Sequence, residues 1–170
     1  MPRGCVMGKS GVLPLLLLLS ACTAAPPVND GMAQREDIPA APRASVAFEN
    51  LARGAYSTLR FERMQAITDD ATLAAVWQQV SADAPPAVDF ARDMAILVAS
   101  GEHRSGGYSI VVTGVEQDGV NLYVQVQLRS PGDACVVSTV LTQPYHLITL
   151  PRSDLPVQFE ITHEVIACGS

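Results

Sequence analysis

The sequence has no cluster of Lys and Arg, and it has few charged or aromatic residues. Of its 170 residues, 16% are charged and 5% are aromatic; Lys+Arg number 11 and Asp+Glu 17, for a net charge of -6. A protein that binds a phosphate backbone needs a basic face, so this balance argues against nucleic acid as a partner. The length allows one globular domain with its own core, and not two of ordinary size.

The chain also lacks the residue frames of common catalytic and metal sites. The segment "SGGY" (105–108) has no Lys and precedes a strand-like run, whereas a P-loop needs a Lys and a following helix. Ser105 and Ser109 both lack the GxSxG frame of a nucleophile elbow. No second His follows four positions after His163, so "THEV" is not a zincin motif. We therefore predict no catalysis, no cofactor, no metal and no small-molecule substrate. A small hydrolase remains an alternative; it would need a deep pocket lined by Ser105, a histidine and an acid.

No apolar run is long enough to cross a membrane as a helix, because the longest, Gly11 to Leu19, has only nine residues. It follows a weakly basic start, as in a signal peptide, and precedes Leu19-Ser20-Ala21-Cys22, which resembles the bacterial lipobox. We predict a signal peptide over 1–21 and acylation of Cys22; the alternative is an ordinary leader cut after "TAA". Two or more acyl chains, such as palmitate, anchor a protein stably. Thr23 is not the aspartate that commonly retains lipoproteins at the inner membrane. We thus expect an envelope protein, at the outer membrane if the host is Gram-negative.

Two of the four cysteines remain once Cys5 leaves with the leader and Cys22 is lipidated. Cys135 and Cys168 then lie in an exported, oxidising compartment, where disulfides persist. Their disulfide would close a loop of about 34 residues. Two free thiols or a metal pair are the alternatives, although this spacing makes a poor zinc site. We predict the disulfide.

The rest of the chain divides into a tether and one β-rich domain. Residues 22–44 are rich in Ala and Pro without apolar periodicity, which indicates a disordered tether. Residues 45–170 carry one helical pattern and several strand patterns. The helix is expected over 69–80, with Leu73, Val76, Trp77 and Val80 on one face. The expected strands cover 59–67, 93–100 (buried on both faces), 107–116 and 122–128 (a hairpin turning at Asp118-Gly119), 135–142, 145–150 and 157–166. The predicted fold is α+β and mainly β: an antiparallel sheet of six to seven strands with one packed helix.

One turn and one corner in this domain are candidate binding loops. Gly106 and Gly107 permit positive φ and a close backbone approach, beside the amphipathic ring of Tyr108. Pro144 and Tyr145 interrupt the strands further along. Both tyrosines could instead cap the core, and the residues alone leave this open.

The segment from Val88 to Arg152 resembles the C-terminal domain of PrcB-type protease complex subunits. The resemblance is carried by Asp89-Phe90, Gly101-Glu102, Gly106-Gly107-Tyr108 and Pro144-Tyr145. It implies a non-catalytic lipoprotein that assembles with, or stabilises, a surface or periplasmic protease. The presence of Cys135 and Cys168 departs from the family pattern.

We therefore predict a lipid-anchored protein-binding domain, an accessory subunit of an extracytoplasmic protease complex. Its expected binding residues are Gly106, Gly107, Tyr108, Pro144 and Tyr145. The alternatives are a protease inhibitor, since the "SGGY" and "QPY" loops faintly resemble those of chagasin-like inhibitors, and a structural envelope lipoprotein.

Overall fold

The computed structural model describes residues 42–168, which lie within one compact unit. The predicted signal peptide, the lipidation site Cys22 and all but the last residues of the predicted tether lie outside this range. Within 42–168, no helix is long and apolar enough to cross a membrane.

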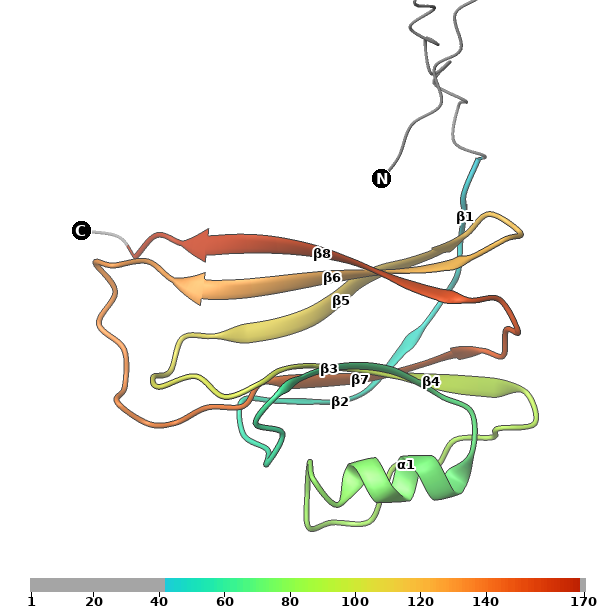
Figure 1. Cartoon of the computed structure of the whole chain (residues 1–170), viewed down its shortest axis with the longest axis horizontal. Helices are drawn as coiled ribbons and strands as arrows, with labels where there is room; N and C mark the ends of the chain where they lie inside the picture. The colour runs from blue at the N-terminus through green and yellow to red at the C-terminus, as the bar shows by residue number, and fades with distance from the viewer. Residues whose placement is uncertain (1–41, 169–170) are drawn as a thin grey trace, which may run out of the picture. The chain divides into compact units, whose positions relative to one another are not determined.

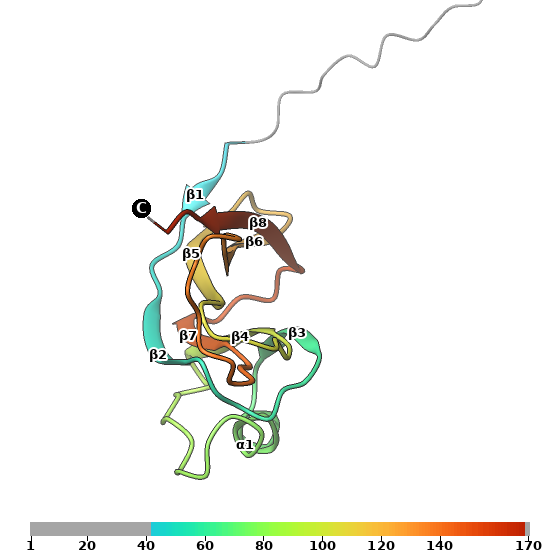
Figure 2. The ribbon, with the colours of Figure 1, turned by 90° about the vertical axis from the view of Figure 1, so that its left-hand side faces the viewer.

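Two four-stranded sheets pack face to face, and one helix covers the outer face of the second sheet (Figures 1 and 2). Sheet A has the order β1-β5-β6-β8, and sheet B has the order β2-β7-β4-β3. The elements are β1 (Ala44–Ser45), β2 (Glu49–Gly54), β3 (Glu62–Ile67), α1 (Asp70–Trp77), β4 (Asp93–Ser100), β5 (Ser109–Gln117), β6 (Leu122–Pro131), β7 (Tyr145–Pro151) and β8 (Val157–Ile166). The predicted class, mainly β with one helix, is confirmed.

Strand β4 lies at the centre of sheet B, and its continuous apolar run follows from this position. Met94, Ile96 and Val98 enter the core between the two sheets, while the alternate residues, Ala95 to Ala99, enter the core beneath α1. Successive side chains of a strand point to opposite faces, so a strand covered on both faces cannot alternate apolar with polar residues. The sequence prediction for residues 93–100 is confirmed to the residue.

Helix α1 forms where its pattern predicts but is shorter, spanning Asp70–Trp77 instead of 69–80. The Asp69 carboxylate caps the first turn by accepting a hydrogen bond from the Thr72 amide at 2.8 Å. Leu73, Val76 and Trp77 are buried against sheet B. The Trp77 indole N–H donates to the Asp83 carbonyl at 2.9 Å, so this ring anchors the helix and the segment that follows it.

The predicted hairpin joins β5 and β6 in antiparallel register, with Gly119 at positive φ in its turn. Every second residue of β6 from Leu122 to Val126 is buried, as the alternation requires. A register shift between Val112 and Gly114 interrupts β5.

Four features differ from the sequence prediction. The strands form two sheets instead of one, and β8 pairs with β6 in parallel, not antiparallel. The predicted strand over 135–142 is wrong: this segment is a loop, because it crosses from the end of β6 in sheet A to the start of β7 in sheet B. Strands β1 and β2, which precede the first expected strand, were not predicted.

The sandwich has two distinct ends, which we call the hairpin end and the loop end. The hairpin end carries the β5–β6 turn, and β1 pairs there with Glu116 and Gln117. The loop end is where β2, β4, β6 and β8 finish, and it carries the connections 55–61, 101–108 and 132–144. The described chain therefore begins at the hairpin end, away from the candidate binding loops (Figure 1).

Candidate protein-contact surface

The glycine turn at the loop end is fixed by the neighbouring 132–144 loop. The Gly106 amide donates to the Ser138 carbonyl at 2.9 Å, and the Thr142 hydroxyl donates to the Ser105 carbonyl at 2.8 Å. Gly107 has φ 88°, and a side chain there would meet Pro131 and Val137 at 3.1 Å. Both reasons for expecting glycine therefore apply: close packing at Gly106, and positive φ with close packing at Gly107.

The turn presents Tyr108 in a stack with His103. Their ring centroids are 4.0 Å apart with an interplanar angle of 8°, and the Tyr108 side chain is half-buried. The His103 Nε2 lies 3.0 Å from the Ser100 hydroxyl. Burial lowers the pKa of His103, which favours a neutral ring at neutral pH. One face of the Tyr108 ring is thus held by His103, and the side chain remains partly exposed.

A hollow of about 220 Å³ opens beside this stack, between the two sheets. It is lined by Glu62, Ser100, His103, Tyr108, Ser109, Leu128, Arg129, Ser130 and His163. The Arg129 guanidinium is paired with the Glu164 carboxylate at 2.8 Å. A hollow of this size falls below the range of ordinary small-molecule pockets and suits a single side chain. Its polar groups can donate and accept hydrogen bonds around such a side chain.

The Ser100–His103 contact in the hollow is a serine–histidine pair, but its surroundings do not complete a triad. A serine nucleophile needs a histidine that a third group orients. Among residues 42–168, no carboxylate hydrogen-bonds to the His103 ring. Ser105, the serine considered from the sequence, does not line the hollow. The same range contains no group of three His, Cys, Asp or Glu side chains able to hold a metal.

Pro144 and Tyr145 do not belong to a contact surface, which corrects the sequence prediction. Both are buried, and Tyr145 is 9% exposed within the core beneath α1. Its ring lies over Gly54 of the paired strand β2, where an added Cβ would come within 2.8 Å of the ring. Burial raises the pKa of Tyr145 accordingly. The question that the residues left open is answered for Tyr145: it faces the core.

Exposed apolar side chains gather at the loop end instead. Phe61 is 85% exposed, and the 132–144 loop exposes four more large apolar residues. We define the loop-end surface as Tyr56, Phe61, Tyr108, Val136, Val137, Val140 and Leu141. Its two main loops contact each other, since the Gln143 amide donates to the Ala55 carbonyl at 2.9 Å. The apolar residues of "CVVSTVLT" (135–142) are the sequence signal for this surface, but their β-branched side chains favour a strand, so the pattern alone does not predict an exposed loop.

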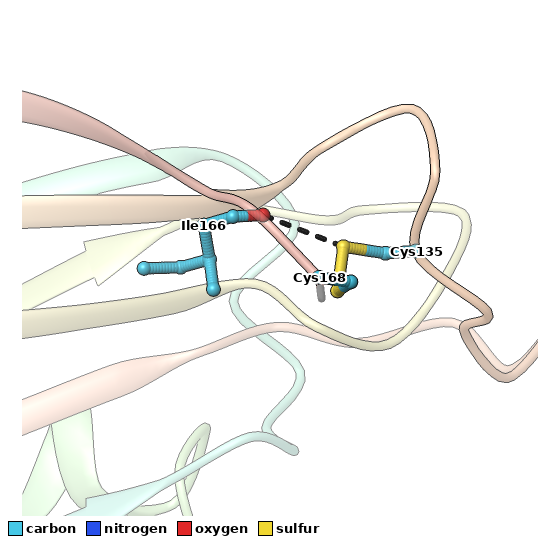
Figure 3. The surroundings of a disulfide bond; sticks show 3 residues. All are labelled: Cys135, Ile166 and Cys168. Atoms are coloured by element: carbon cyan, nitrogen blue, oxygen red, sulfur yellow. Dashed lines mark hydrogen bonds between the residues drawn. A yellow bond between two sulfur atoms is a disulfide. The ribbon is translucent and has the colours of Figure 1, made fainter. Parts of the chain in front are cut away.

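The predicted disulfide joins Cys135 to Cys168, with 5.1 Å between their Cα atoms. It ties the start of the 132–144 loop to the chain just beyond β8 (Figure 3). The Ile166 carbonyl reinforces this junction by accepting a hydrogen bond from the Gly132 amide at 3.0 Å, and it lies 3.4 Å from the Cys135 sulfur. The loop that supports the glycine turn is therefore itself held to sheet A.

Residues 94–151 match the family model described as PrcB C-terminal. No curated protein and no solved structure matches the chain. The matched segment runs from β4 to β7 and includes the glycine turn and the whole 132–144 loop. The match confirms, over residues 94–151, the resemblance to the PrcB C-terminal domain seen in the sequence.

Proposed function

We propose that this protein is a lipid-anchored, non-enzymatic binding domain that serves as an accessory or stabilising subunit of an extracytoplasmic protease complex. The loop-end surface is its contact site for the protease. The observation that carries the proposal is the gathering of exposed apolar side chains around an ordered tyrosine turn; all of them except Tyr56 and Phe61 lie within the segment that matches the PrcB C-terminal family.

The composition of the loop-end surface supports a protein partner. Exposed apolar groups that cluster on one part of a soluble domain indicate an interaction site, whereas scattered ones need no explanation. Tyr108 is a suitable central residue because its ring is already held by His103, and little side-chain entropy is lost on binding. The hollow beside it can accept one side chain of the partner.

The position of the surface supports its use by an anchored protein. The described chain begins at the hairpin end, next to β1, and the loop-end surface lies at the other end of the strands. A tether that leads to this entry point would leave the loop end free to meet a partner.

The proposal is tested by capturing the full-length tagged protein from membrane extracts and identifying bound proteases by mass spectrometry. Val136→Asp, Val140→Asp and Tyr108→Ala should each lower the recovered protease about tenfold, as truncation of a central contact does. Val120→Asp is the matched control, because Val120 is 66% exposed at the hairpin end. Equal recovery with all four variants would show that the loop end is not the contact site. If no protease is recovered with the wild-type protein, the accessory-subunit function is wrong.

A proteolysis assay with the recovered enzyme separates the accessory role from inhibition. An accessory subunit should leave the activity of the protease unchanged or prolong its lifetime at elevated temperature. An inhibitor should lower the activity in proportion to its concentration.

A further inference from the structure

Strand β8 forms one edge of sheet A along its whole length. All ten residues, Val157 to Ile166, pair in parallel with β6 and no register shift interrupts them. In the sheet order β1-β5-β6-β8, no described strand lies on the other side of β8 (Figure 2). One row of backbone donors and acceptors along ten residues therefore has no sheet partner within residues 42–168.

The β8 edge has few of the features by which natural proteins prevent an edge strand from pairing with another chain. Natural edge strands are commonly short, bulged or protected by Lys or Pro. β8 has no Lys, no Pro and no bulge. Its two carboxylates are already engaged on the outer face of the sheet, Glu160 with Arg43 at 2.8 Å and Glu164 with Arg129 at 2.8 Å. Ile161, which points toward the space between the sheets beside Phe159, is left 40% exposed.

We propose that β8 pairs antiparallel with β8 of a second copy of this chain, around a two-fold axis at Ile161. In an antiparallel pair, two residues directly opposite each other point their side chains to the same face of the sheet. When two identical strands pair around a two-fold axis, the axis must therefore pass between a residue and its own copy, and not between two successive residues. With Ile161 on the axis, nine residues overlap. The opposite pairs are Val157 with Val165, Gln158 with Glu164, Phe159 with His163, Glu160 with Thr162, and Ile161 with itself.

The strand is self-complementary in this register and not in the adjacent ones. The pairs centred on Ile161 bring apolar or aromatic groups together on the inner face and place no two carboxylates opposite each other. Moving the axis to Thr162 sets Glu160 opposite Glu164 twice, and moving it to Glu160 sets that carboxylate opposite its own copy. Like charges directly opposite in a sheet are destabilising. The side chains of β8 therefore complement those of a second β8. Pairing the two edges would join the A sheets of two copies into one eight-stranded sheet.

The first test is the mass of the full-length protein in density-matched detergent, measured by sedimentation equilibrium. The wild-type protein is expected at the mass of two chains. Thr162→Glu sets two carboxylate pairs opposite each other and should raise the dissociation constant about tenfold. Thr162→Lys, which loses the same hydroxyl but faces Glu160 with opposite charge, should keep the dimer. The double variant Thr162→Glu with Glu160→Lys should restore it.

The second test fixes the register. Ile161→Cys should form an intermolecular disulfide on mild oxidation of the full chain in membranes, because paired residues on the axis bring two Cβ atoms within disulfide reach. Val120→Cys, exposed at the hairpin end, is the control and should form no intermolecular disulfide. A one-chain mass for the wild-type protein, or equal effects of Thr162→Glu and Thr162→Lys, would overturn the proposal. The inference does not depend on the proposed protease partner, since both tests use this chain alone.

Discussion

His146 makes a buried link between the two sheets, and it should make the stability of the domain sensitive to mild acid. It lies on β7 in sheet B and is 1% exposed. Its Nδ1 accepts a hydrogen bond from the Val112 amide of β5, at 2.9 Å, and its Nε2 lies 2.7 Å from the Asn50 side-chain oxygen. Since Nδ1 must accept and Nε2 must donate, only the neutral ring satisfies both contacts. The Val112 amide lies next to the register shift in β5, so the histidine provides an acceptor where the ladder is interrupted.

The size of the effect follows from the pKa of His146. Burial, and to a lesser extent the charge of Arg53, lower this pKa from the ordinary 6.5 to about 4. A difference of about 2.5 between the unfolded and folded pKa values corresponds to about 3 kcal/mol, at about 1.4 kcal/mol for each pKa unit. Because the folded pKa is the lower one, this stability is fully present above pH 6.5. It is lost as the pH falls from 6.5 toward 4, since the unfolded chain binds the proton first. About 2 kcal/mol should disappear between pH 7 and pH 5.

The measurement is urea unfolding of the purified protein at pH 7, 6 and 5. His146→Asn retains an acceptor for the Val112 amide but cannot titrate, so its free energy of unfolding should change far less between pH 7 and 5, from a lower starting value. His103 also has a lowered pKa and contributes in the same direction, so His103→Asn serves as the control and should keep most of the pH dependence. Hydrogen bonds lower the pKa values of Asp69, Asp89 and Asp118 from the ordinary 3.8. The stability that these carboxylates contribute to the folded domain is therefore lost only at a pH below the range measured here. If the free energy of unfolding of the wild-type protein is constant from pH 7 to 5, or if NMR gives His146 a pKa near 6.5, the reasoning is wrong.

Three further predictions concern the disulfide, one glycine and the lipid anchor. Replacing Cys135 and Cys168 by Ser should lower the free energy of unfolding by about 3 to 4 kcal/mol, because their separation of 33 closes a long loop in the unfolded chain; urea unfolding with and without reductant checks this. Gly54→Ala should cost about 1 to 3 kcal/mol in a thermal unfolding assay, since its methyl would come within 2.8 Å of the Tyr145 ring, and the cost should fall in a Tyr145→Leu background. Cys22→Ala should shift the protein from the membrane fraction to the soluble fraction, and metabolic labelling with palmitate should label only the wild-type protein.

The parts of the fold that the sequence predicts are those set by local periodicity and turn chemistry. In the run 93–100, the odd-numbered and the even-numbered residues between the two ends are both apolar, which predicts a strand covered on both faces. The spacing of Leu73, Val76 and Trp77 identifies the buried face of α1. Asp118 and Gly119 mark the hairpin turn, where the Asp118 carboxylate accepts from the Val120 and Asn121 amides at 2.9 Å. In each case the pattern that carries the prediction lies within one short segment of the sequence.

What the sequence does not predict is set by partners far along the chain. The alternation of β8 is the same whether its neighbour runs parallel or antiparallel, so the pairing of residues 157–166 with 122–131 could not be inferred. The pattern of 135–142 is strand-like, but the strand before it, β6, and the strand after it, β7, lie in different sheets. The segment must therefore cross between the sheets, and this follows from the topology and not from its own residues. The burial of Tyr145 does not follow from its sequence neighbours, because its packing partner, Gly54, lies about 90 residues earlier. The exposed apolar residues of the loop end and the open edge of β8 likewise depend on which strands become neighbours, so the sequence alone does not predict them.

The two proposed interfaces are compatible in geometry, and together they restrict how the protein could lie at a membrane. Arg43 stacks 3.5 Å over the Tyr123 ring and bonds to Glu160, so the described chain begins on the outer face of sheet A, at the hairpin end. A two-fold axis at Ile161 runs perpendicular to sheet A and sends the loop ends of the two copies in opposite directions. With Cys22 lipidated as we propose, the two anchors of this dimer would reach one membrane when the strands lie parallel to it, with the outer faces of the A sheets toward the lipid. Each loop-end surface then opens sideways, so that one dimer could hold two protease molecules along the plane of the membrane.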